Sequence, residues 1–206
     1  YHWDKTMFGS LLHFSSWSLM GNLAWMTMGQ GVNVLLNIFF GPIINTAWGI
    51  ATQVNYAITL FIENIRVAVN PQIVKSFASG DIKYMHKLVF ESAKYSYFLL
   101  LMLILPLLLE TNIVLHYWLK LVPEYTIIFC QLILINTLVQ SFDGSFAIVF
   151  QAIGRIKENQ LFSGGTYLLV LPLSSILLSL SHPPQIVFYI QIGATIIVSF
   201  IIKVYL

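Results

Sequence analysis

The sequence predicts an all-α protein, a polytopic transmembrane helix bundle of about six spans. Of its 206 residues, 58% are hydrophobic and only 9% are charged, and the mean hydropathy is +0.81. Soluble domains carry about a quarter charged residues, so lipid must solvate most of this surface. Backbone groups in hydrocarbon need hydrogen bonds within their own segment, which favours helices. The alternating pattern of a membrane β-barrel is missing.

The six predicted spans follow from length and apolar composition. A membrane-crossing helix needs about 20 mostly apolar residues. The segments that qualify are Ser16–Phe40, Ile43–Val69, Ser92–Leu109, Tyr125–Phe150, Leu161–Leu180 and Gln185–Leu206. We expect Asn70-Pro71 to end the second span. We expect residues 1–206 to form one membrane-embedded helical domain. The start at Tyr1 without a methionine predicts that the chain is a fragment of a longer protein.

The connections between the spans differ in charge. One set contains Lys120 alone, whereas the other set contains the remaining nine basic residues: Lys5, Arg66, Lys75, Lys83, Lys87, Lys94, Arg155, Lys157 and Lys203. Positively charged loops stay in the cytoplasm, so we expect both ends of the chain to face inward.

One connection has an amphipathic pattern. Within residues 70–91, Asp81 is suited to cap a helix in which apolar and charged residues fall on separate stripes. We expect a cytoplasmic amphipathic connector at the membrane surface, and a docking surface for another protein is the alternative.

Three of the predicted spans carry a polar stripe within about 60–80° of the helix surface. The members are Asn22, Gln30, Asn33 and Asn37 on the first span, Thr52, Thr59, Glu63, Arg66 and Asn70 on the second, and Asn136, Gln140 and Asp143 on the fourth. A charged side chain near the centre of a span costs about 2.5–3.5 kcal/mol on insertion scales. We therefore expect the stripes to face one another across an aqueous cavity.

Several of these residues are candidates for function. Arg66 either anchors the interface paired with Glu63, three residues away, or binds an anionic head group. Asp143 is a candidate for lining the cavity, with a proton or sodium site as the alternative, and Glu63 is a second candidate for ion coupling. The amides expected to line the cavity, unless they only pack helices together, are Asn33, Asn37, Asn70, Asn136 and Gln140.

Other classes of function lack their signatures. The five histidines are scattered without the spacing of metal ligands, and no nucleophile motif or phosphate-binding glycine loop occurs. The net charge of +2 and the absence of a basic, aromatic-rich run argue against nucleic acid as a partner. We expect no enzyme activity, no catalytic residues, no metal and no bound cofactor.

Two stretches carry a resemblance to a known family. "GQGVNVLLNIFFGP" (Gly29–Pro42) and the block from Gly49 to Asp81 resemble the bacterial Wzx-type polysaccharide flippases, and "PEYTIIF" (Pro123–Phe129) and "QAIGRIKENQ" (Gln151–Gln160) fit the same pattern. These flippases belong to the multidrug/oligosaccharidyl-lipid/polysaccharide exporter superfamily. The resemblance implies that the chain is much of the second lobe of a two-lobe transporter.

The resemblance also implies a function. Such proteins translocate undecaprenyl-pyrophosphate-linked oligosaccharide across the bacterial inner membrane by alternating access, for polysaccharide, O-antigen and lipopolysaccharide biosynthesis. It implies a pyrophosphate-facing role for Arg66, a proton or sodium gradient coupled through Glu63 or Asp143, and other polysaccharide-assembly membrane proteins as partners. The alternatives are a cation-coupled multidrug exporter of the same superfamily, a membrane glycan polymerase or transferase, or a scaffold whose polar stripes only pack helices.

Overall fold

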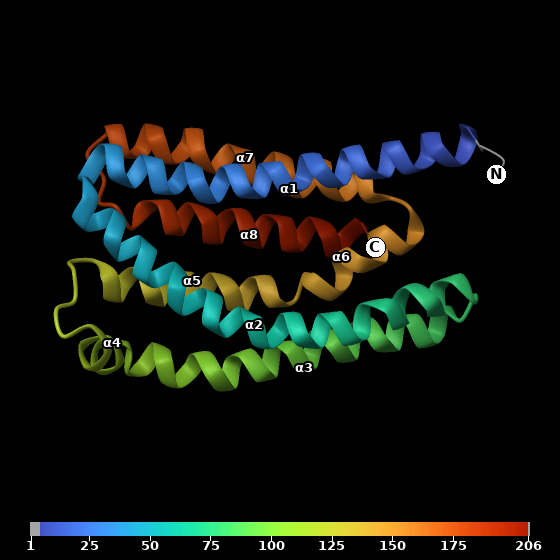
Figure 1. Ribbon diagram of the computed structural model, residues 1–206, viewed down its shortest axis with the longest axis horizontal. Helices are drawn as coiled ribbons and strands as arrows, with labels where there is room; N and C mark the ends of the chain where they lie inside the picture. The colour runs from blue at the N-terminus through green and yellow to red at the C-terminus, as the bar shows by residue number, and fades with distance from the viewer. Residues whose placement is uncertain (1–4, 206) are drawn as a thin grey trace.

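The computed structural model describes residues 5–205, which form eight α-helices and no strand within that range (Figure 1). The helices are α1 (Lys5–Phe40), α2 (Pro42–Ala78), α3 (Ile82–Leu109), α4 (Thr111–Leu119), α5 (Thr126–Ser141), α6 (Gly144–Ile153), α7 (Ile156–Ser179) and α8 (Ile186–Tyr205). The all-α fold class is confirmed. Leu206, the last residue of the sixth predicted span, lies outside the described residues.

The described residues contain four helices long and apolar enough to cross a membrane, in α1, α3, α7 and α8. The helices α5 and α6 meet at a short break with a bend of 43°. Together they are long and apolar enough to count as a fifth candidate, if the two form one span. The sequence predicted one uninterrupted helix from Tyr125 to Phe150, and the structure corrects this. The helix α2 is not among the four, since the polar residues along it lower its hydropathy.

The second predicted span continues past the Asn70-Pro71 pair that was expected to end it. Pro71 lies inside α2, which runs on to Ala78. Proline removes one backbone N–H donor, but it does not end a helix whose following turns are packed. Here Ile73 is fully buried in an apolar cluster with Met85 and Val89 of α3 and Val149 of α6, and this packing holds the last turns of α2 in place.

The helices pack side by side in one continuous series, and α1 and α2 diverge to form an open V (Figure 1). Neighbouring helices follow the spatial order α1, α7, α8, α5, α2 and α3, and each packs against the next. The helices α1 and α2 meet at the turn formed by Gly41, whose φ of 79° suits glycine, and they separate along their lengths (Figure 1). A cluster around Phe129 and Phe188, whose ring centroids are 4.5 Å apart, fills the narrow end of the V.

The expected connector of residues 70–91 is the tip of a helical hairpin. It comprises the last turns of α2, a short turn at Gly80, and the first turns of α3. The predicted cap is confirmed, because the Tyr84 backbone N–H donates to the Asp81 carboxylate over 3.0 Å. The hairpin tip, the start of α1 and the end of α8 all lie toward the same end of the bundle (Figure 1).

The packing of α1 on α7 yields a stability prediction. A Cβ added at Gly31 would overlap the Leu171 side chain, whereas a Cβ at Gly29 would meet nothing within 4 Å. We expect Gly31→Ala to destabilise the protein by about 1–3 kcal/mol through overpacking, and Gly29→Ala to be neutral or stabilising. Thermal unfolding in detergent, followed by size-exclusion chromatography, measures both, and equal stability of the two variants would contradict the α1–α7 contact.

Candidate functional site

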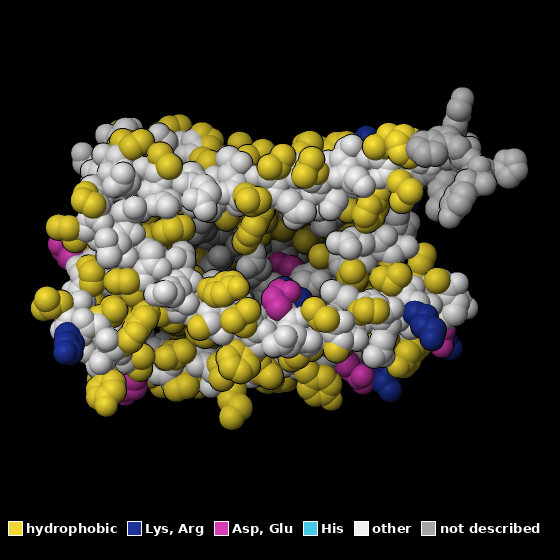
Figure 2. All heavy atoms as spheres, viewed as in Figure 1, with side chains coloured by type: hydrophobic (Ala, Val, Ile, Leu, Met, Phe, Trp, Pro, Cys, Tyr) yellow, Lys and Arg dark blue, Asp and Glu magenta, His cyan; other side chains and the backbone are white. Residues whose placement is uncertain are grey.

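A polar cleft of about 610 Å³ occupies the wide part of the V. Side chains from α1, α2, α5, α6, α7 and α8 line it, together with Asp143 in the break between α5 and α6. The cleft opens on a side of the bundle that carries many exposed apolar side chains (Figure 2). Figure 2 shows the hollow at the centre of this face, with acidic and basic side chains visible within it.

The charged residues that line the cleft, which we call the charged wall, are Glu63, Arg66 and Asp143. Glu63 and Arg66 lie one turn apart on α2, and Arg66 Nη1 donates to Glu63 Oε1 over 2.7 Å. The guanidinium also lies directly against Gly144, where a Cβ would overlap its Nη2, Nε and Cζ atoms. Glycine at this position therefore provides the space in which the Arg66 head group rests.

Asp143 is held at the α5–α6 break by α8. Its side chain is buried, Ser199 Oγ donates to its Oδ2 atom, and Lys203 Nζ lies 3.8 Å from its Oδ1 atom. The ammonium of Lys203 also lies 5.2 Å from the Phe142 ring centroid, and Tyr97 of α3 stacks on the same ring with centroids 4.4 Å apart. With Arg66 of α2 against Gly144, residues of α2, α3 and α8 thus surround the break.

The charges in and beside the cleft balance. Glu63 faces Arg66, and Asp143 faces Lys203, so two carboxylates are matched by two cations. In a bundle clad in lipid this arrangement avoids the cost of an isolated buried charge. Both ion pairs keep some contact with solvent, since the Arg66 side chain is 24% exposed and that of Lys203 is 42% exposed.

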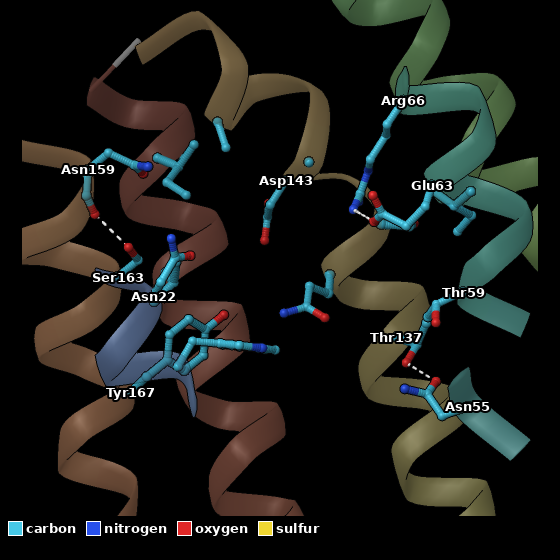
Figure 3. A pocket seen from close by; sticks show the side chains of 18 residues that line it. Asn22, Asn55, Thr59, Glu63, Arg66, Thr137, Asp143, Asn159, Ser163 and Tyr167 are labelled. Atoms are coloured by element: carbon cyan, nitrogen blue, oxygen red, sulfur yellow. Dashed lines mark hydrogen bonds and ion pairs between the residues drawn. The ribbon is translucent and has the colours of Figure 1, made fainter. Parts of the chain in front are cut away.

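The opposite side of the cleft, which we call the neutral wall, carries no charge. It consists of Asn22 and Trp25 from α1 and Asn159, Ser163 and Tyr167 from α7. The Trp25 and Tyr167 rings meet edge to face with centroids 5.0 Å apart. Figure 3 shows Asn22, Asn159, Ser163 and Tyr167 across the cleft from Glu63 and Arg66, with Asp143 between the two groups.

Two hydroxyl–amide contacts complete the surroundings of the cleft. Thr137 Oγ1 of α5 donates to Asn55 Oδ1 of α2 over 2.6 Å, which ties these two helices together beside the charged wall (Figure 3). Ser163 Oγ donates to the Asn159 backbone carbonyl over 2.6 Å. Neither contact uses the Asn159 side-chain oxygen, which is buried without a hydrogen-bond partner.

The structure brings together four of the eight predicted site residues. Glu63, Arg66, Gln140 and Asp143 line the cleft. The other four, which are absent from its lining, are Asn33, Asn37, Asn70 and Asn136.

These four amides occupy different environments. Asn37 is exposed on α1 near the Gly41 turn, and Asn33 is half-buried one turn earlier. Asn70 is half-buried and precedes Pro71, beyond the cleft. Asn136 is half-buried on α5 with a buried, unpartnered Oδ1 atom, which places it at a helix contact.

The cleft also contains residues that the sequence did not single out, chiefly Asn55, Trp25 and the three α7 residues of the neutral wall. Asn22, by contrast, belongs to the polar stripe that was expected to face the cavity, and it lines the cleft. Asn159, Ser163 and Tyr167 are spaced four residues apart on α7, the same one-face pattern that identified the other stripes. The pattern was missed because the fifth span was predicted to begin at Leu161, which left Asn159 in a loop. The observed helix begins at Ile156.

Comparison with models of known protein families, with curated proteins and with solved structures finds no match to this chain. The chemistry of the site is therefore interpreted from its own residues.

Water access to the cleft can be measured by cysteine labelling. Cys130 is the single cysteine of the sequence and is buried, so it contributes little background. We expect Glu63→Cys and Gln140→Cys to react with a membrane-impermeant maleimide from one side of the membrane, and Leu134→Cys, on the buried face of α5, to stay unlabelled. A Gln140→Cys variant as unreactive as Leu134→Cys from both sides would exclude an aqueous cleft.

Proposed function

We propose that this bundle forms part of the path by which a membrane transporter carries the polar head group of a lipid-linked oligosaccharide between leaflets. The observation that carries the proposal is the polar cleft on the side of an apolar bundle, with the Arg66 guanidinium in its wall. An amphiphile could keep its tail in lipid while its head group occupies such a cleft. The resemblance to the Wzx-type flippases supports the same function.

Arg66 is the residue best suited to meet a pyrophosphate. A guanidinium presents five N–H donors in a planar fork that matches phosphate oxygens. The hydrogen bond to Glu63 uses the Nη1 atom, whereas the Nη2 and Nε edge rests on Gly144. Because Gly144 covers that edge, a phosphate would meet Arg66 where its partly exposed side chain borders the cleft, beside the Glu63–Arg66 pair.

Glu63 and Asp143 are the candidates for coupling transport to a proton or sodium gradient. Asp143 suits this role because its Oδ1 atom accepts no hydrogen bond and its charge is opposed by the partly exposed Lys203. Binding of a proton or cation at Asp143 would alter the ion pair with Lys203 at the α5–α6 break. Coupling would then act at the point where α5 and α6 bend.

The proposed setting is the bacterial inner membrane, with the hairpin tip and both chain ends on the cytoplasmic side. Nine of the ten basic residues belong to the connections and ends assigned to that side. The proposed partners are the lipid-linked oligosaccharide, the bilayer and other proteins of polysaccharide assembly. A cation exporter of the same superfamily is the second candidate, favoured by the two carboxylates in the cleft and opposed by the basic residue beside each.

Flipping of a fluorescent lipid-linked saccharide in proteoliposomes tests the proposal. We expect Arg66→Ala to lower the initial rate of flipping by about 10-fold or more, because the variant lacks the charged hydrogen bonds of the guanidinium. Arg155→Ala, on an exposed turn outside the cleft, is the matched control and should flip at the wild-type rate. Absence of flipping by the wild-type protein, together with efflux of a cationic dye, would favour the drug exporter instead.

The role of the charged wall in coupling has its own test. Asp143→Asn keeps an acceptor for Ser199 but removes the charge that faces Lys203. We expect flipping by this variant to lose its response to an imposed proton or sodium gradient, while Asp81→Asn, at the hairpin turn, keeps it. The double variant Asp143→Asn, Lys203→Met restores neutrality and so separates lost coupling from lost stability. A gradient response that survives in both variants would remove Asp143 as the coupling site.

A further inference from the structure

The outward face of α3 near the hairpin tip carries a row of exposed lysines. On the inward face, Met85 and Val89 are buried in the apolar cluster that joins α3 to α2 and α6. The exposed residues opposite them lie within about 80° of one another around the helix. We call this set the lysine stripe, and its members are Lys83, Lys87, Phe90, Lys94 and Phe98.

The length of α3 places the lysine stripe at the boundary of the membrane. The helix has 28 residues and is about 42 Å long, whereas the hydrocarbon core of a bilayer is about 30 Å thick. Counting about 20 residues back from Glu110, the charged residue that follows α3, puts the other boundary near Phe90. Lys83 and Lys87 then lie among the lipid head groups. Lys94 lies about one turn inside, where its flexible side chain can carry the ammonium back to the boundary.

The lysine stripe has a surplus of positive charge. Glu91 lies at its edge, and the Glu91 Oε1 atom is 3.9 Å from Lys87 Nζ. Within residues 5–205, Lys83 and Lys94 form no ion pair. Figure 2 shows basic side chains at the hairpin end of the bundle. Three ammonium groups beside one carboxylate, at the level of the head groups, favour a ligand with net negative charge.

Phe90 adds an apolar contact at the same depth. Its side chain is 63% exposed, although its ring meets Phe146 of α6 edge to face with centroids 5.7 Å apart. The ring is therefore held in place by α6 and still offers apolar area to the first methylene groups of a lipid chain. Phe98, about two turns deeper along α3, is also exposed and continues this apolar surface into the hydrocarbon.

The depth of these residues distinguishes between possible ligands. A soluble phosphate would contact the ammonium groups and leave both phenylalanine rings uncovered. A protein that docked on the hairpin tip from the aqueous side would not reach Lys94 or Phe98, which lie within the hydrocarbon. A phospholipid contacts both, because its phosphate and its chains occupy these two depths.

We propose that the lysine stripe is a binding site for an anionic phospholipid in the leaflet at the hairpin end. Lys87 and Lys94 reach the phosphate from opposite sides along the helix axis, and Lys83 faces the outer part of the head group. An acyl chain lies along Phe90 and Phe98. The site is separate from the cleft, whose lining includes no residue of α3, so it does not depend on what the cleft carries.

Native mass spectrometry of the purified protein tests the site directly. The protein in detergent micelles is titrated with dioleoyl phosphatidylglycerol, which is anionic, and with dioleoyl phosphatidylcholine, which has the same chains and no net charge. We expect the first anionic lipid to bind about 5-fold or more tightly than the first zwitterionic lipid. sn-Glycerol 3-phosphate, which has a phosphate and no chains, should not bind measurably.

The variants change only exposed side chains, so the packed core of the bundle is undisturbed. Lys87→Gln and Lys94→Gln should each weaken phosphatidylglycerol binding by about 5-fold, and the double variant should bind the two lipids alike. Glu91→Gln should tighten binding, because it removes the carboxylate that pairs with Lys87. Lys120→Gln, an exposed lysine that follows α4, is the matched control and should bind as the wild type does.

Each outcome supports or rejects the site. Equal affinity of the wild-type protein for the two lipids would overturn it, as would an unchanged preference in the double variant. A loss as large for Lys120→Gln as for Lys87→Gln would show that net charge, and not the lysine stripe, sets the affinity. Binding of sn-glycerol 3-phosphate as tight as that of phosphatidylglycerol would assign the lysines to a soluble phosphate instead.

Discussion

The structure depends on one constraint, which is that polar and charged groups in a bundle surrounded by lipid must interact with each other or with water. The outer surface is rich in exposed apolar side chains such as Met102, Ile38 and Phe200, so the helices can hold charged groups only where these groups meet each other or water. The Glu63–Arg66 and Asp143–Lys203 pairs satisfy this condition at neighbouring positions. Their grouping determines where the bundle can be open, because the V between α1 and α2 widens where the polar side chains lie.

The α5–α6 break is the structural centre of this arrangement. Arg66 of α2 rests on Gly144, Ser92 of α3 donates to Ser145 over 2.8 Å, and Ser199 of α8 donates to Asp143. A straight helix through this point would keep its backbone hydrogen bonds, but it would not present Asp143, Gly144 and Ser145 to α8, α2 and α3 together. The bend therefore couples the charged wall to most of the bundle.

The fold class was predictable from the sequence because composition and segment length alone require membrane helices. The candidate site was predictable only in part. The angular position of a residue around a helix follows from its spacing, which is why Glu63, Arg66, Gln140 and Asp143 were identified. The neighbours that a helix face meets depend on how helices diverge and where they begin. Asn33 and Asn37 share a face with Asn22, yet they lie nearer the closed end of the V, where apolar packing fills the space.

The α5–α6 break was missed although Asp143-Gly144 is a dipeptide typical of turns, because the long apolar segment around it favoured one continuous helix. No proline marks it, and the glycine at 144 is needed for a contact with Arg66, 78 positions earlier in the chain. The α7 residues of the neutral wall were missed because apolar composition placed the start of that helix at Leu161, whereas the helix begins at Ile156. Long-range contacts and helix boundaries are therefore where single-sequence reasoning failed.

The turn at Gly41 also has a mechanical consequence. The helix α2 has 37 residues and is thus about 55 Å long at about 1.5 Å per residue. A rotation of about 5° about the turn would displace the far end of α2 by about 5 Å, roughly one helical pitch. The narrow end of the V would barely change, and the mouth would widen or close by nearly the breadth of a sugar. The hairpin tip is the part of α2 farthest from the Gly41 turn, so it would move the most (Figure 1).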